Sequence, residues 1–180
     1  DWSHTVAMYY GIISQTDDAI GRVLNKLDEL GMYENTMVIF TSDHGDTCGD
    51  HRMLDKHYIL YDNVTRVPLV IRWPKIIKQG KRFGGFVYNE LDLPPTILDI
   101  TGIEPPKEHF HGKSMAAILE EKEVGDWRKE IVCTYNGQQF GLYTQRMIRN
   151  KQWKYIWNTT DVDEFYDMRK DPGELNNLIY

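Results

Sequence analysis

The pattern of hydrophobic positions predicts a long helix followed by two buried strands. Residues 5–30 repeat apolar side chains near the 3.6-residue period of an α-helix, and Gly31 supplies a left-handed stop. Residues 35–41 and 67–73 are instead apolar almost throughout, which is typical of strands covered on both faces. A helix combined with two such strands indicates an α/β layered core.

Shorter elements are predicted further along the chain. Residues 83–87 have the composition of a short strand, and residues 92–100 and 114–121 are predicted helices, the first with prolines in its opening turn. Short aromatic segments separated by turn residues then predict an antiparallel meander. These segments are residues 131–135, 145–149, 153–157 and 164–166.

Two parts of the chain differ in these patterns. Residues 1–125 are predicted to form an α/β part built from helices and buried strands. Residues 126–180 are predicted to form a small antiparallel β meander that ends in a helix. The expected fold class is therefore α/β, with a small C-terminal antiparallel sheet.

Composition and charge exclude several classes of protein. The 180 residues include 21 Lys and Arg against 27 Asp and Glu, a formal net charge of −6. This balance argues against nucleic acid or an anionic membrane as the main partner. No apolar run reaches the roughly 18 residues of a membrane span. Because residue 1 is Asp rather than Met, we expect the chain to be a piece of a longer protein, whose compartment stays open.

The most informative polar residues follow the first buried strand. Asp43 and His44 come directly after it, and Gly45 allows a turn sharp enough for the two side chains to converge. In sheets whose strands are covered on both faces, ligands gather beyond the carboxyl ends of the strands. A carboxylate with an imidazole can form half of a metal shell. The alternative is a polar turn in which Asp43 caps the backbone and His44 is solvated.

A second cluster of ionisable residues follows in residues 49–57. It includes His51, Lys56 and His57. A lysine close to a metal would suit a negatively charged oxyanion. The alternative is an ordinary exposed loop, in which charged residues are common.

Two further features each have a structural alternative. His109 and His111 could chelate a metal from an extended segment, but the surrounding proline-rich sequence favours a loop. The aromatic residues of the predicted meander could stack on a sugar ring, but such residues more often form the core of a small sheet.

Several segments, taken together, resemble the sulfatase family of the alkaline-phosphatase-like superfamily. In order they are Tyr9–Gly11, Asp18–Leu24, Leu30–Gly31, Asn35–Gly45, Gly49–His51, Lys56, Arg66–Ile71, Asp92–Ile103, His111–Ser114, Trp153–Ile156, Glu164–Asp167 and Asp171–Leu178. Each segment alone is a weak signal, but the ordered set covers nearly the whole chain and is specific. The resemblance implies that the predicted strands belong to part of an alkaline-phosphatase-like sheet.

The resemblance also implies roles for individual residues. Asp43 and His44 would be two ligands of the divalent cation of a sulfatase active site. Calcium is expected there, with manganese or zinc as alternatives because calcium prefers oxygen ligands to imidazole. Lys56 would contact the sulfate oxygens. His51 and His57 lie close enough in sequence to take part in catalysis.

The family's nucleophile is absent from this sequence. It is a Cys or Ser oxidised to formylglycine within the motif C/S-x-P/A-x-R, and neither Cys48, Cys133 nor any serine fits that motif. The family's leading Asp-Asp metal pair is also missing. The resemblance therefore implies the C-terminal portion of a sulfatase, inactive alone and binding a divalent metal weakly or not at all.

The parent protein is expected to hydrolyse the sulfate ester of a small molecule or glycan. The family suggests a periplasmic or extracellular location, and the open strand edges suggest a homodimer or pairing with the missing N-terminal half. One alternative is a phosphodiesterase, phosphonate hydrolase or phosphotransferase of the same superfamily. Another is a non-catalytic carbohydrate-binding module.

Overall fold

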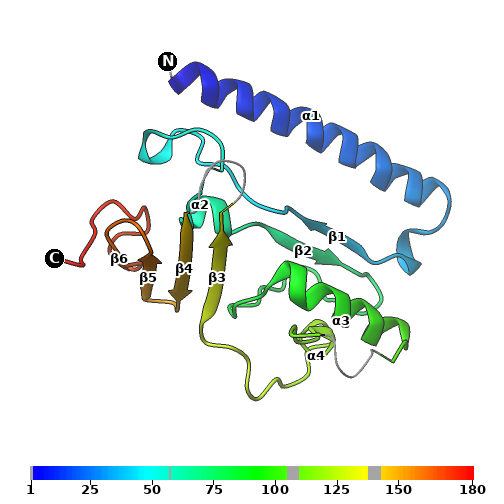
Figure 1. Cartoon of the computed structure of the whole chain (residues 1–180). Helices are drawn as coiled ribbons and strands as arrows, with labels where there is room; N and C mark the ends of the chain where they lie inside the picture. Colours follow the sequence, from blue (N-terminus) through cyan, green and yellow to red (C-terminus); the bar gives the residue numbers. More distant parts are fainter. Residues whose placement is uncertain (1, 57, 105–109, 138–142) are drawn as a thin grey trace.

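The computed structural model describes residues 2–56, 58–104, 110–137 and 143–180. The helices and strands, in chain order, are α1 (Trp2–Glu29), β1 (Val38–Thr41), α2 (Asp62–Thr65), β2 (Leu69–Arg72), α3 (Asn89–Thr101), α4 (Ala116–Leu119), β3 (Ile131–Asn136), β4 (Thr144–Arg149), β5 (Trp153–Asn158) and β6 (Glu164–Asp167). Figure 1 shows a block of helices around β1 and β2, with the β3–β6 sheet beside it. None of the described helices has the length and apolar character needed to cross a membrane.

Helix α1 confirms the long helix predicted from periodicity. It ends where Gly31 adopts a left-handed φ of 65°. The N–H of Gly31 donates to the carbonyl of Asp28, and the N–H of Met32 donates to that of Leu27. These two bonds form a Schellman cap, which satisfies carbonyls that the last helical turn leaves without partners. No residue of α1 is fully buried.

Strands β1 and β2 form a two-stranded antiparallel sheet. Their register runs from Val38 opposite Arg72 to Thr41 opposite Leu69. In Figure 1 this pair lies between α1 and α3, which fits the predicted layered core. The expectation that both strand faces are covered is not met within the described residues, because Phe40 is 45% exposed and Val70 is 58% exposed.

The total accessible surface area is also larger than expected for a compact monomer. The accessible area is 12,944 Å², whereas a compact monomer of 21.2 kDa is expected to expose about 9,100 Å². Large apolar side chains are exposed along α1, on β1 and β2, on the strands of the C-terminal sheet and in the tail after β6.

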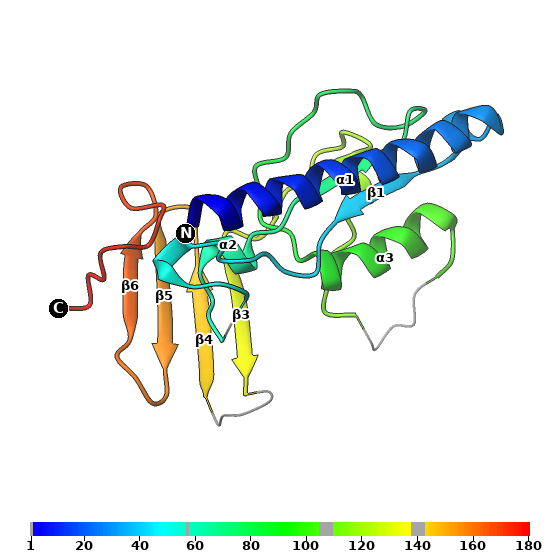
Figure 2. The ribbon, with the colours of Figure 1, turned by 90° about the horizontal axis from the view of Figure 1, so that it is seen from above.

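The C-terminal sheet confirms the predicted meander. Its antiparallel strands follow the order β3-β4-β5-β6, and Figure 2 shows them side by side. The main hydrophobic core lies between one face of this sheet and the segment that leads into α2. Its buried members are Leu60, Met147, Ile156, Tyr166 and Met168. The segment around α2 is thus fixed on the meander.

The structure corrects two predictions. Residues 83–87 do not form a strand, because the carbonyl of Phe86 accepts hydrogen bonds from the side chains of Trp127 and Arg128 rather than from a neighbouring strand. The prediction of a terminal helix is also wrong. The described residues after β6 have no helix, because the side chain of Asn177 accepts from the N–H of Phe165 and ties the tail to β6. The division at residue 125 stays a prediction.

Candidate active site

The segment after β1 is held by side chains from other elements. Asn89, the first residue of α3, donates from Nδ2 to the carbonyl of Ser42 at 2.7 Å and to Oγ1 of Thr41 at 3.2 Å. Thr41 Oγ1 donates in turn to the carbonyl of Pro68 at 2.8 Å. These bonds fix the end of β1 against both α3 and the start of β2, so the residues that follow begin from a rigid position.

Gly45 is required where this segment passes α2. Its N–H donates to the carbonyl of Val64 at 2.8 Å. A Cβ at this position would lie 1.9 Å from the carbonyl oxygen of Asn63, far inside van der Waals contact. Only glycine allows the backbone to approach α2 this closely. The local geometry therefore depends on both Gly45 and the position of α2.

The structure brings Asp43, His44 and Lys56 together. His44 Nε2 lies 3.5 Å from Asp43 Oδ2 and 3.0 Å from Lys56 Nζ. The side chain of Asp43 is 82% exposed, whereas the side chain of His44 is 38% exposed. A carboxylate, an imidazole and an ammonium group thus converge on one solvent-accessible point. The roles assigned to these three residues stay predictions.

Hydrogen bonds set the electrostatics of this point. His44 Nδ1 lies 2.9 Å from the carbonyl oxygen of Gly45. A carbonyl can only accept, so Nδ1 carries the proton, which leaves the lone pair of Nε2 facing the Lys56 ammonium. The backbone N–H of His44 donates to Asp43 Oδ1 and lowers the pKa of that carboxyl below its ordinary value. Asp43 is therefore ionised and His44 presents an acceptor nitrogen.

These donors form only part of a metal shell. Asp43 supplies carboxylate oxygens and His44 supplies Nε2, whose ring is oriented through Nδ1 as in many metal-bound histidines. Across the described ranges of the chain, no group of three or more His, Cys, Asp or Glu side chains could hold a metal ion. The residues fit a divalent cation as two of its ligands, and Lys56 would have to leave Nε2 before the metal could bind.

The other predicted site residues lie elsewhere or were not placed. The ring of His51 stacks on Tyr61, with 4.1 Å between centroids. In the described contacts His51 makes no hydrogen bond or ion pair with Asp43, His44 or Lys56. His57 and His109 lie outside the described residues, and His111 is exposed.

Sequence reasoning missed Asn89 and the buried ion cluster behind α2. The side chain of Lys154, which is 0% exposed, lies between Asp62 and Glu174. Asn89 sits within a helix that the sequence predicted to begin at residue 92. Lys154 sits in an aromatic strand, where a lysine suggests a solvated position. No local signal identifies either contact, because the partners are far apart in the sequence.

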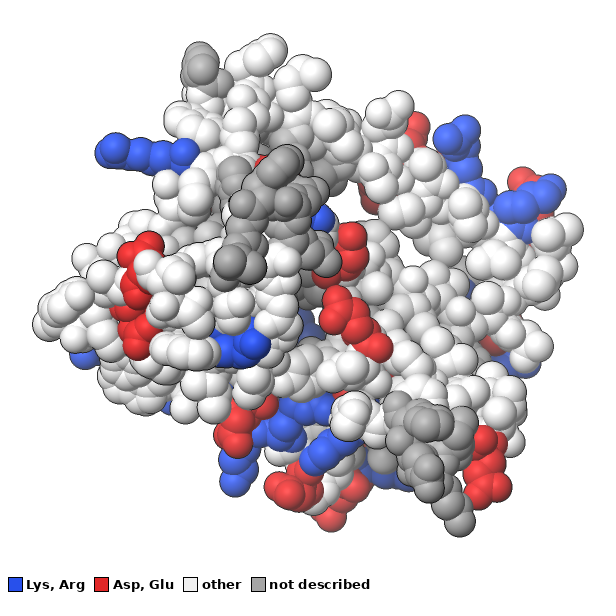
Figure 3. All heavy atoms as spheres, in the orientation of Figure 1, with Lys and Arg blue, Asp and Glu red and all other residues white. Residues whose placement is uncertain are grey.

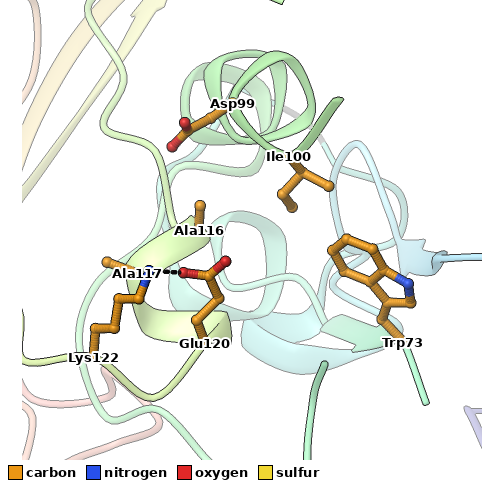
Figure 4. Close-up of a pocket in the computed structure, with 7 residues that line it drawn as sticks. All are labelled: Trp73, Asp99, Ile100, Ala116, Ala117, Glu120 and Lys122. Atoms are coloured by element: carbon orange, nitrogen blue, oxygen red, sulfur yellow. Dashed lines mark ion pairs between the residues drawn. The ribbon is translucent and has the colours of Figure 1, made fainter. Parts of the chain in front are cut away.

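A separate pocket has no part in this site. Figure 4 shows it between α3, α4 and the end of β2, with Trp73, Ile100 and Glu120 among its lining. Its volume is about 320 Å³, and Glu120 is ion-paired with Lys122 at its edge. None of its lining residues belongs to the segment that carries Asp43 and His44.

Comparisons with known proteins identify the family. The family model described as "N-sulphoglucosamine sulphohydrolase, C-terminal" matches residues 49–180. The chain belongs to the sulfatase family. A second family model, described as a protein of unknown function, matches residues 2–89 of this sulfatase chain.

Individual relatives agree with this family. The sulfatase chain is 37% identical to N-acetylglucosamine-6-O-sulfatase of Bacteroides thetaiotaomicron over 177 residues, covering 95% of this chain and 31% of that protein. A solved structure in complex with its substrate D-glucosamine-2-N,6-O-disulfate has a TM-score of 0.84 at 37% identity, with coverages of 92% and 34%. The phosphonate monoester hydrolase of Agrobacterium radiobacter has a TM-score of 0.86 at 31% identity, with coverages of 96% and 36%.

These comparisons confirm the predicted family and the alkaline-phosphatase-like fold. The sulfatase chain spans about a third of the length of the relatives it matches.

Proposed function

We propose that this chain is part of a hydrolase that cleaves sulfate esters of sugars, with Asp43, His44 and Lys56 in its active site. The observation that carries this proposal is the convergence of these three side chains directly after β1, in a chain of the sulfatase family. The substrates of its relatives, a 6-O-sulfated N-acetylglucosamine and a disulfated glucosamine, support a sulfated sugar as the substrate class.

Asp43 and His44 would hold a divalent cation between them. Calcium is the expected ion, and the imidazole keeps manganese and zinc as alternatives. A bound cation supplies positive charge next to the sulfuryl oxygens, where negative charge grows during ester cleavage. The remaining ligands and the nucleophile, expected to be a formylglycine, would come from residues outside this chain.

Lys56 would bind the sulfate group. Its ammonium carries three N–H donors on a flexible stem, and in the structure one of them faces His44 Nε2. With a cation held by Asp43 and His44, the ammonium of Lys56 would be repelled from His44 Nε2 and could turn toward an oxyanion. Lys56 would then offset charge on the sulfuryl oxygens in the transition state.

The test uses the whole protein that contains this chain. Turnover of N-acetylglucosamine-6-sulfate is measured for wild type, Asp43→Ala and Lys56→Ala. We expect Lys56→Ala to lower kcat/KM by about 10²–10³-fold, the effect of removing one oxyanion donor. The exposed Lys75→Ala, far from the site in sequence, serves as the control and should stay within about twofold. Full activity in both site variants would refute the proposed site.

Phosphonate ester hydrolysis is a second candidate function. The similarity to a phosphonate monoester hydrolase favours it, since a sulfate monoester and a phosphonate monoester carry the same single negative charge. The two functions are separated by comparing kcat/KM for an aryl sulfate and an aryl phosphonate monoester. A preference for the phosphonate above about tenfold, or roughly 1.4 kcal/mol in transition-state binding, would replace the first candidate with the second.

A further inference from the structure

We propose that this chain carries a second binding site, away from the candidate active site, for a short anionic saccharide. The site is an open groove of about 810 Å³ lined by residues 83–85, residues 127–129, residues 150–153 and Arg169. We call it the basic groove. In Figure 1 the turn between β4 and β5, which forms one wall, lies at the opposite end of the meander from the segment after β1. None of its lining residues belongs to the segment that carries Asp43, His44 and Lys56.

The charge of the groove is the first argument. Lys129, Lys151 and Arg169 line it, and in the described part of the chain none of the three forms an ion pair. Among the described residues, no acidic side chain lines the groove, although the chain as a whole has a net charge of −6. Figure 3 shows the more usual arrangement, with acidic and basic side chains interspersed over one face of the molecule. A group of unpaired cations without a carboxylate is therefore suited to an anion.

One cation of the groove has a structural role instead. The guanidinium of Arg128 binds both carboxylate oxygens of the buried Asp92 and also donates to the carbonyl of Phe86. It anchors the groove wall to α3 and has little capacity left for a ligand. The binding charge therefore comes from Lys129, Lys151 and Arg169.

The aromatic side chains are the second argument. Trp153 remains 37% exposed while one face of its ring stacks on Phe165, with 5.1 Å between centroids and 12° between planes. Trp127 is fixed by donating from Nε1 to the carbonyl of Phe86 and by an edge contact with Phe83. Rings fixed in this way lose little entropy when a ligand stacks on them. Fixed aromatic rings next to unpaired cations suit a sugar that carries sulfate or carboxylate groups.

A glycan fits better than a nucleic acid. Proteins that bind nucleic acid commonly make about 6–10 phosphate contacts, whereas the groove offers only three unpaired cations. A short saccharide can be held by fewer charges because its rings also stack on tryptophan. The choice of an anionic saccharide rests on the proposed function, under which a sulfated sugar polymer is the substrate. The groove would then hold part of the polymer at residues other than Asp43, His44 and Lys56.

The experiment measures binding by calorimetry in the whole protein that contains this chain. The probe is a heparin-derived hexasaccharide, titrated into Lys56→Ala protein so that turnover and active-site contacts contribute little. Adding Lys151→Ala and Arg169→Ala should weaken binding about tenfold, the sum of two exposed charge contacts. The matched control adds Lys170→Ala, an 87% exposed lysine that does not line the groove, and should bind as before.

The outcomes separate this proposal from the proposed function. If Lys151→Ala with Arg169→Ala leaves hexasaccharide binding unchanged, or if the Lys56→Ala protein does not bind the probe, the basic groove proposal fails whatever the activity. If single-stranded DNA binds the groove as tightly as the hexasaccharide, the saccharide assignment fails. Groove-dependent binding by a protein without sulfatase activity would support the groove and refute only the proposed function.

Discussion

Removing the buried Lys154 ammonium should destabilise the meander strongly. Its Nζ lies 3.1 Å from Asp62 Oδ1 and 2.5 Å from Glu174 Oε1. The Glu174 side chain is almost fully buried, and its other oxygen accepts the N–H of Asp62 at 2.6 Å. Arg149 pairs with the second oxygen of Asp62 at 2.8 Å. In Lys154→Met, Asp62 keeps the cation of Arg149, whereas Glu174 loses the one cation that pairs with it in the described part of the chain.

The magnitude follows from that asymmetry. Removing one partner of a buried ion pair costs about 3–5 kcal/mol, because the remaining charge stays buried. Arg149 limits the loss at Asp62, so we expect the lower end, about 3 kcal/mol at neutral pH. Burial already raises the pKa of Glu174 above its ordinary value. An acid with a raised folded-state pKa loses stability as pH rises through that value, so the defect should shrink as the pH is lowered from neutral.

Urea unfolding provides the assay. Tryptophan fluorescence includes a signal from β5, because two of the chain's five tryptophans, Trp153 and Trp157, lie on the same strand as Lys154. Lys154→Met should lower the unfolding free energy by about 3 kcal/mol, and adding Glu174→Gln should restore part of it by removing the unpaired charge. The exposed Lys75→Met is the control, with a change within about 0.5 kcal/mol. If Lys154→Met unfolds at the same urea concentration as this control, the electrostatic argument is wrong.

Three further predictions follow from single contacts. Gly45→Ala should lower the proposed sulfatase activity of the whole protein at least tenfold, by roughly 1.4 kcal/mol, because its Cβ would collide with α2. Gly21→Ala, in open space on α1, should leave kcat/KM for the same substrate unchanged. The Tyr155 hydroxyl donates to Asp163 and holds the pKa of that carboxyl below its ordinary value, a stabilisation that is lost when Asp163 is protonated. Tyr155→Phe should therefore lose less stability below pH 4 than the wild type, measured as urea midpoints at pH 7 and pH 3. Arg128→Lys should lower the melting temperature by several degrees, because lysine cannot replace the bidentate contact of the guanidinium with the buried Asp92 carboxylate. Equal melting curves would contradict this.

The sequence predicted elements whose signals are local. Helix α1 follows from periodicity and α3 from the prolines of its first turn, and both end at a glycine with positive φ, Gly31 and Gly102. The meander follows from short aromatic segments separated by turn residues. The strand predicted at residues 83–87 is wrong although their composition favours a strand. The side chains of Trp127 and Arg128, about 40 residues away, bind the Phe86 carbonyl that a neighbouring strand would need.

The site was predictable only as a set of neighbouring residues. Asp43 and His44 adjoin in sequence, and Lys56 follows within the same loop, so their type and spacing were visible. The contacts that position these residues could not be predicted. Asn89 reaches Ser42 across 47 residues, and Lys154 reaches Asp62 across 92. Contacts at such separations leave no periodic trace in a single sequence, because each partner taken alone is an ordinary polar residue.

Helix α2 lies between the segment of Asp43 and His44 and the ion cluster of the meander. It has four residues, too few for a stable isolated helix, so its position must come from its neighbours. On one side the carbonyls of Asn63 and Val64 meet Gly45 and thereby set the turn that presents His44. On the other side its first residue is held by the ion cluster of the meander. Through Asp62 of α2, the ion cluster that includes Glu174 is thus connected to the segment of Asp43 and His44. The segment Asp171–Leu178 would therefore have a positioning role without direct contact with the proposed metal ligands.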